Sequence, residues 1–216
     1  MEKVLFLAHT DEQGMLPKAA LETLTAAKSL ADSLGGELSV GLVGEDVSAA
    51  AESIGACNAT FYGVSGADFA SARYGSDAAA FEALCKESGA TMVVAPATSR
   101  VSRALPGVAQ RLDGRIDTHA TGVSAEDGLT VTRWYYRQRM YANLSRSQRP
   151  WMITVSPGCF EPWSGSGSVD VTAVSANLDP AVANTTITGV ETPSADEQTI
   201  RPDAELLLVA GAGWTK

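Results

Sequence analysis

Short apolar runs alternate with helical stripes over the first 112 residues of the chain. A short run without polar alternation predicts a strand that is buried on both faces. Apolar residues spaced three and four apart predict one face of a helix. The predicted strands cover residues 3–8, 38–43, 59–62 and 92–94, and the predicted helical faces are Ala20, Leu24, Ala27, Ala31 and Leu34; residues 48–53; Phe81, Leu84 and Cys85; and Val101, Leu105, Val108 and Leu112.

Local signals place the ends of these helices. Pro17 suits a first helical turn, and Gly35 suits the end of that helix. We expect Ser76 to cap the helix that contains Phe81. The repeated β-α order predicts the α/β class with a doubly wound, mainly parallel sheet, in which residues 91–112 form the central unit. Right-handed crossovers then place the ligand crevice at the carboxyl ends of the strands.

The pattern becomes extended after Gly114. Residues 129–136 alternate and residues 140–144 can pair back on them, so the sequence predicts a β-hairpin over residues 129–144. Residues 151–155 predict a return strand into the main sheet. We therefore expect residues 1–160 to form an α/β domain with an added hairpin.

Residues 161–204 are rich in Ser, Thr, Asp, Pro and Gly, and we expect an extended peripheral segment with strand-like islands at 169–174 and 185–190. Within residues 205–216, the apolar run 206–209 predicts a last buried strand. Small residues after such a strand are typical of the turn into a helix. We interpret this end of the chain as the start of a second domain that the chain does not contain.

Composition limits the classes of partner. The net charge is −9, which argues against nucleic acid because phosphate binding needs a basic surface. No apolar run approaches the roughly 20 residues that span a bilayer, so we expect no membrane insertion. Cys57, Cys85 and Cys159 are far apart and form no Cys-x-x-Cys motif, which argues against a zinc or dithiol site and favours a reduced, cytoplasmic protein.

Two loops are candidate anion sites. The glycines Gly211 and Gly213 could cradle a phosphate, although a structural turn is the favoured interpretation because no helix-forming sequence follows them. Ser99 and Arg103, with Arg100, lie near a predicted helix N-terminus and could hold an anion; the alternative is a helix cap beside two solvated arginines.

The two histidines do not indicate catalysis. His9 follows the first predicted strand and His119 lies past a fifth candidate strand, so both could face the crevice. Neither has a cysteine or carboxylate at ligand spacing, and no Ser/His/Asp arrangement can be argued. We expect both to be satisfied polar residues, with no catalytic residue and no metal site.

The predicted hairpin carries an excess of arginine interleaved with aromatic residues. This composition can indicate nucleic-acid binding. The alternation of side chains along a strand, however, would by itself place the arginines on the solvent-exposed face and the aromatics on the packed face. On an acidic protein, a protein partner is favoured, because aromatics and arginine dominate interface energetics. We predict a subunit or self-association interface at Tyr136, Arg137, Arg139 and Tyr141.

Several stretches together resemble the N-terminal domain of the electron transfer flavoprotein alpha-subunit family. The likeness follows the family order along essentially the whole chain, and the combination is more specific than any single piece. The first stretch, which resembles the family's first βαβ unit, comprises residues 4–8 with Leu16-Pro17 and residues 24–31 ahead of Gly35-Gly36-Glu37. The second, after the fourth predicted strand, comprises Ala97-Thr98-Ser99, Arg103, Leu105-Pro106, Ala109 and Arg111-Leu112. The hairpin and return strand contribute Thr132-Arg133, Tyr136, Arg149-Pro150, Met152, Thr154-Val155 and residues 157–160, and the last stretch is residues 204–211.

The resemblance implies an adenine nucleotide alpha hydrolase-like fold. It also implies an electron carrier, rather than an enzyme in its own right, that pairs with an electron transfer flavoprotein beta subunit. Such a heterodimer accepts electrons from dehydrogenases and passes them on through FAD. In that family the alpha C-terminal domain makes most FAD contacts, so we expect this chain alone to bind no FAD tightly.

Three departures from the family pattern leave the redox partner open. Gly211-Ala212-Gly213-Trp214 stands where the family has Gly-Gly-Arg-Gly, so the arginine is lost; Ser156 replaces an arginine, and His119 replaces an aspartate. The alternative function is a stand-alone adenine-nucleotide-binding module, similar to universal stress proteins, without redox activity. A purely structural or regulatory interaction protein is a third possibility, and a homodimer could form in isolation.

Overall fold

The computed structural model describes residues 2–125, 128–189, 191, 194, 206–211 and 213. The chain divides into two units, Met1–Thr185 and Thr186–Lys216. All α-helices and β-strands assigned within the described residues belong to the first unit. The candidate sites of that unit can therefore be derived from one sheet and its flanking helices.

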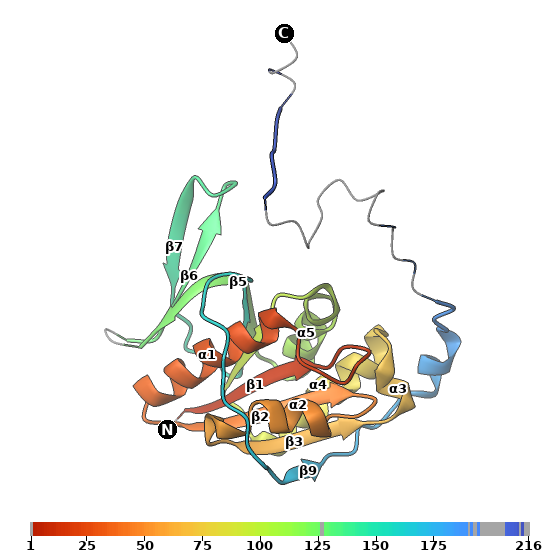
Figure 1. The fold of residues 1–216 in the computed structure, drawn as a ribbon. Helices are drawn as coiled ribbons and strands as arrows, with labels where there is room; N and C mark the ends of the chain where they lie inside the picture. Colours follow the sequence, from red (N-terminus) through yellow and green to blue (C-terminus); the bar gives the residue numbers. More distant parts are fainter. Residues whose placement is uncertain are drawn as a thin grey trace. The chain divides into compact units, whose positions relative to one another are not determined.

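One nine-stranded sheet organises the first unit (Figure 1). Its strands are β1 Lys3–His9, β2 Glu37–Gly44, β3 Thr60–Ser65, β4 Met92–Pro96, β5 Arg115–Ser124, β6 Thr130–Tyr135, β7 Met140–Leu144, β8 Trp151–Val155 and β9 Val171–Ala173. They lie in the order β7-β6-β5-β8-β4-β1-β2-β3-β9. From β5 to β9 the neighbours are parallel, whereas β6 pairs antiparallel with both β5 and β7. The predicted fold class, including the hairpin, is confirmed.

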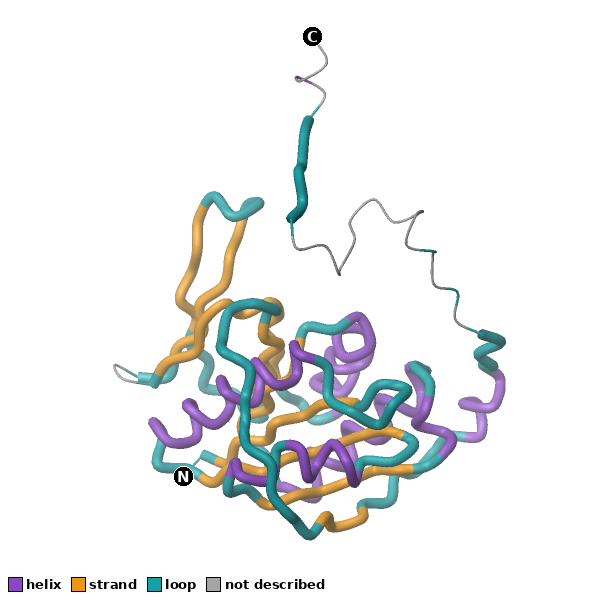
Figure 2. The backbone as a smooth tube through the Cα atoms, in the orientation of Figure 1, coloured by secondary structure: helices purple, strands orange, loops and turns teal. Residues whose placement is uncertain are grey.

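Helices cover both faces of the sheet (Figure 2). They are α1 Lys18–Ser33, α2 Ser48–Ser53, α3 Ala67–Ala70, α4 Tyr74–Ser88 and α5 Ser99–Arg111, with short 3₁₀ turns η1 Gly55–Cys57 and η2 Pro180–Asn184. Side chains of β1 alternate between two cores: Phe6 packs in the core that contains Leu24 of α1, and Leu5 and Leu7 pack in the core that contains Phe81 of α4. The strand is apolar from Val4 to Ala8 because neither face of this part meets water.

Two local predictions are wrong. Ser76 does not cap α4, because the helix begins at Tyr74 and Ser76 is buried inside its first turns. His119 does not follow a strand but lies within β5, where it has φ +56° beside an irregularity in the pairing with β8. A bulge of this kind breaks the alternation of side chains, so the sequence pattern does not show that the strand continues past His119.

The second half of the chain departs from the predicted pattern at three places. The island at 169–174 contains β9, which pairs with β3, so part of the expected peripheral segment joins the main sheet. Residues 185–189 form no strand, and Val190 lies outside the described residues. The predicted buried strand at 206–209 is wrong: these residues form no strand and are 45–89% exposed. A strand needs a pairing neighbour, and none is assigned to this run within the described chain.

The segment between β8 and β9 crosses the face that carries α1 and α2 (Figure 1). The Trp163 N–H donates to the carbonyl of Leu21 at 3.1 Å, and the Gly167 N–H donates to the carbonyl of Glu52 at 2.9 Å. The approach is closest at Gly55, where an added Cβ would lie 2.1 Å from the Gly167 carbonyl oxygen. Glycine is therefore required at Gly55 by the neighbouring backbone.

Candidate functional site

The strand order changes direction between β1 and β4, so the loops that follow these two strands diverge at one point of the carboxyl edge. Two side chains connect the loops: His9 Nε2 lies 3.2 Å from Thr98 Oγ1. The His9 ring also contacts the Thr10 carbonyl through Nδ1 at 3.1 Å. Burial lowers the pKa of His9. A neutral, hydrogen-bonded ring at this position suits a structural role.

The predicted anion-binding residues lie at the start of α5, but the guanidinium groups of Arg100 and Arg103 already have protein partners. Thr98 caps this helix by accepting a hydrogen bond from the Val101 N–H at 3.2 Å, while Ser99 is exposed. Arg103 Nη2 donates to the carbonyl of Ala72 at 2.9 Å. Anion binding by Ser99 and Arg103 stays a prediction.

The third member of this group, Arg100, forms a buried ion pair with Asp77 of α4. Arg100 Nη2 lies 2.7 Å from Asp77 Oδ1, and the two side chains are 8% and 0% exposed. Further hydrogen bonds run from its Nη2 to the Phe69 carbonyl at 2.6 Å and from its Nη1 to the Ala70 carbonyl at 3.4 Å. Arg100 therefore ties α5 to α4 and to the end of α3, and its charge is not available to a ligand.

A hollow of about 450 Å³ opens beside the loops that follow β1 and β2. Its polar lining includes four carboxylates and no lysine or arginine: Asp11, Glu12, Glu45 and Asp46. We call these residues the acidic hollow. Within the described chain none of the four carboxylates forms an ion pair. Such a lining repels phosphate groups, and the described residues contain no group of His, Cys, Asp or Glu placed to hold a metal ion.

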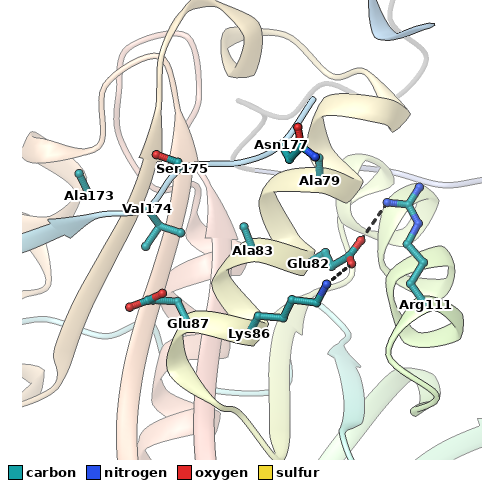
Figure 3. Close-up of a pocket in the computed structure, with 10 residues that line it drawn as sticks. All are labelled: Ala79, Glu82, Ala83, Lys86, Glu87, Arg111, Ala173, Val174, Ser175 and Asn177. Carbon is teal, nitrogen blue, oxygen red and sulfur yellow. Dashed lines mark hydrogen bonds and ion pairs between the residues drawn. The ribbon is translucent and has the colours of Figure 1, made fainter. Parts of the chain in front are cut away.

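A second hollow, of about 630 Å³, lies between α4, the end of α5 and the segment after β9 (Figure 3). Glu82 points between two cations here, with Lys86 Nζ at 2.6 Å and Arg111 Nη1 at 3.1 Å. These hydrogen bonds, first that from Lys86, lower the pKa of Glu82. The charges of this hollow neutralise one another, so it offers no strong recognition of an anion or a cation.

The hairpin formed by β6 and β7 exposes large aromatic side chains. Trp134 and Tyr141 pair edge to face with ring centroids 5.7 Å apart, yet they are 45% and 62% exposed. The guanidinium carbon of Arg133 lies 4.8 Å from the centroid of the Tyr135 ring. Exposed aromatics in such a group are typical of a surface that another molecule covers.

The connection at the end of this hairpin, residues 136–139, is called the hairpin tip below. Tyr136, Arg137 and Gln138 have φ values of +48°, +55° and +62°. For residues with a side chain, this left-handed conformation costs roughly 1–2 kcal/mol each. Among the described residues Arg137 and Arg139 form no ion pair. The tip thus presents uncompensated positive charge on strained backbone, and strain of this kind often accompanies function.

The glycine loop near the end of the chain lies in the second unit. Gly211 and Gly213 are exposed, whereas Ala212 and residues 214–216 lie outside the described residues. The described part of this loop shows no side chain that supports a phosphate contact. Phosphate binding at Gly211 and Gly213 stays a prediction.

Neither the buried partner Asp77 nor the acidic hollow was predicted from the sequence. Nothing in the local sequence connects Asp77 to Arg100, which is 23 residues away. The hollow did have a signal, because acidic pairs follow two strands that the fold makes neighbours: Asp11 and Glu12 after β1, and Glu45 and Asp46 after β2.

Comparison with known protein families supplies the remaining observation. The sequence model of the electron transfer flavoprotein domain matches residues 4–179. No curated protein matches the chain in a sequence search. No helix within the described residues has the length and apolar character needed to cross a membrane. Because the family match covers most of the sequence, the chain belongs to the electron transfer flavoprotein domain family.

Proposed function

We propose that this member of the family is the N-terminal domain of an electron transfer flavoprotein alpha subunit. In this proposal it forms a heterodimer with a beta subunit, and the complex carries electrons from dehydrogenases through FAD. The domain acts as an electron-carrier subunit rather than as a catalyst in its own right. The observation that carries the proposal is the family match over residues 4–179. The order of the alpha-type motifs along the chain favours alpha over beta.

The residues at the carboxyl edge do not suit the pyrophosphate of FAD. The acidic hollow would repel it, and Arg100, the buried cation near this edge, is bound to Asp77. We therefore propose that the chain alone binds FAD weakly and that most flavin contacts come from elsewhere in the complex. A cytoplasmic location is part of the proposal, since three separated cysteines suit a reducing compartment.

The test is reconstitution with a beta subunit. The 216-residue chain is purified alone and after co-expression with an electron transfer flavoprotein beta subunit, and complex formation and FAD content are measured. We expect a complex with the beta subunit and little FAD on the chain alone. A failure to form any complex would contradict the heterodimer, and stoichiometric FAD on the chain alone would contradict the proposed division of the flavin site.

The stand-alone nucleotide-binding module is not favoured. A universal-stress-like site would hold phosphates at the carboxyl edge, where four carboxylates gather without a lysine or arginine among the lining residues. Calorimetry with AMP and ATP separates the two functions. Micromolar binding of either nucleotide would favour the stand-alone nucleotide-binding module. The absence of any heat of binding would favour the electron transfer flavoprotein subunit.

The hairpin is our proposed contact with the beta subunit. Tyr141 supplies exposed apolar area, and Arg137 and Arg139 supply a charged rim, which mainly affects association rate and salt dependence. Co-purification is compared for the wild type, Arg137→Glu/Arg139→Glu and Tyr141→Ala. We expect both variants to weaken the complex at low salt. Unchanged recovery of the beta subunit with both variants would exclude the hairpin from the interface.

A further inference from the structure

Uncompensated charges gather at two places on the first unit. The hairpin tip carries Arg137 and Arg139, and the acidic hollow carries its four carboxylates, all without ion pairs in the described chain. Most cations elsewhere are matched locally, as Lys28 is by Asp32 and Lys86 by Glu82. The chain thus has one cationic projection and one anionic depression, and neither is neutralised within the described residues of its own molecule.

We propose that the hairpin tip of one molecule docks into the acidic hollow of a second copy of this chain. The guanidinium groups of Arg137 and Arg139 would lie among the hollow's carboxylates, and Tyr136, which is 74% exposed, would contribute apolar contact. Charge-assisted bonds between guanidinium and carboxylate are among the strongest polar contacts in proteins. The proposal concerns the chain by itself and does not rest on its electron-transfer role.

The sheet separates the two surfaces within one molecule. Five neighbour spacings lie between β7 and β1 in the strand order, which amounts to about 24 Å at ~4.8 Å per spacing. The tip joins β6 to β7 at one edge of the strand order, and the hollow lies beside the loops after β1 and β2. A rigid sheet cannot bring these surfaces together, so the attraction acts between molecules.

A second copy is favoured over other occupants by this complementarity. An anionic ligand is repelled by the hollow, whereas a second copy supplies two cations on a projecting element and has a receiving surface for the first molecule's own tip. Because tip and hollow are different patches, the contact closes as a dimer only if both copies exchange tips; otherwise it adds further copies. A contact limited to a tip and a hollow of about 450 Å³ is small, and we expect weak, salt-sensitive association.

Sedimentation of the purified chain tests the proposal. At about 0.1 M salt we expect the mean mass to rise above the monomer's 22.4 kDa as protein concentration increases. At about 1 M salt we expect the monomer, because the screening length falls from ~10 Å to ~3 Å. Association that is indifferent to salt would overturn the proposal and would point to an apolar contact, such as the exposed run 206–209.

Charge reversal identifies the surfaces. The tip variant is Arg137→Glu/Arg139→Glu, and the hollow variant is Glu12→Lys/Glu45→Lys. Each alone should weaken self-association by about tenfold or more, as loss of close charge pairs does. Mixing the two variants should restore association. The acidic tip of the tip variant then meets the basic hollow of the hollow variant, and the unchanged tip of the hollow variant meets the unchanged hollow of the tip variant.

A matched control separates the site from net charge. Lys3 is the first residue of β1, and Arg115 is the first residue of β5. Both side chains are exposed and form no ion pair among the described residues. Lys3→Glu/Arg115→Glu makes the same charge change as the tip variant and should associate more strongly than it does. The proposal is overturned if this control behaves like the tip variant, or if the mixture of tip and hollow variants stays monomeric. Circular dichroism confirms that each variant is folded.

Discussion

Replacing Asp77 by alanine is expected to destabilise the first unit by about 3–5 kcal/mol, the usual cost of breaking a buried ion pair by removing one partner. The carboxylate receives three hydrogen bonds from Arg100, at 2.7, 3.0 and 3.1 Å, and its side chain is fully buried. An arginine cannot lose its proton in a protein. After the substitution Arg100 would remain buried and charged, with only the carbonyls of Phe69 and Ala70 as partners.

Urea unfolding followed by circular dichroism measures this cost. In Asp77→Ala/Arg100→Met no charge is left unpaired, and we expect this variant to recover most of the lost stability. Asp68→Ala is the matched control, since it removes an exposed carboxylate 2.8 Å from Arg73 and should cost less than about 1 kcal/mol. The reasoning is refuted if Asp77→Ala costs no more than Asp68→Ala, or if the double variant is no more stable than Asp77→Ala.

Three further predictions concern burial and close packing. Because burial lowers the pKa of His9 from its ordinary 6.5, the unfolded chain binds more protons below that pH, so stability should fall as pH drops below about 6.5. Urea titrations of His9→Gln should lack this part of the fall. Gly55→Ala should lower the free energy of unfolding by about 1–3 kcal/mol, because the new Cβ meets the backbone oxygen of Gly167. Gly107→Ala should lower it by less, because the new Cβ meets only the end of the Tyr74 side chain, which can move. Equal unfolding midpoints for these two variants would contradict the argument. Iodoacetamide should label only Cys159 in the native protein by mass spectrometry, since burial raises the pKa of the other two thiols to about 11 and about 12; two labels would show that a buried thiol is accessible.

The fold class could be predicted from the sequence because the spacing of apolar residues depends on which faces of a strand or helix are buried. β1, β2 and β4 are covered on both sides, so they read as continuous apolar runs, and α5 shows one clear stripe. The full extent of strand β5 was not predicted, because the strand is half-buried and irregular at His119. The run 206–209 shows the opposite failure: its apolar sequence suggests burial, but composition cannot supply the neighbouring strand that burial requires.

The candidate sites were less accessible because their properties depend on pairing across the fold. Arg100 and Arg103 look alike in the sequence, yet one is buried on Asp77 and the other donates to a backbone carbonyl. Neither pairing follows from spacing along the chain. What can be read in advance is which residues follow parallel strands, because the carboxyl ends of those strands share one edge of the sheet.

The position of the acidic hollow at the carboxyl edge of the sheet bears on function. In a doubly wound sheet the carboxyl edge at the change of strand order is the default place for a ligand with phosphate groups. Here that edge holds four carboxylates, a half-buried histidine whose pKa is lowered by burial, and an arginine already bound to an aspartate. The electrostatics therefore oppose the ligand that the topology would favour. We therefore expect a domain of this kind to contribute surface rather than a nucleotide site. The hairpin exposes aromatic side chains, and Arg137 and Arg139 form no ion pair in the described chain, so it is the surface we propose for a partner.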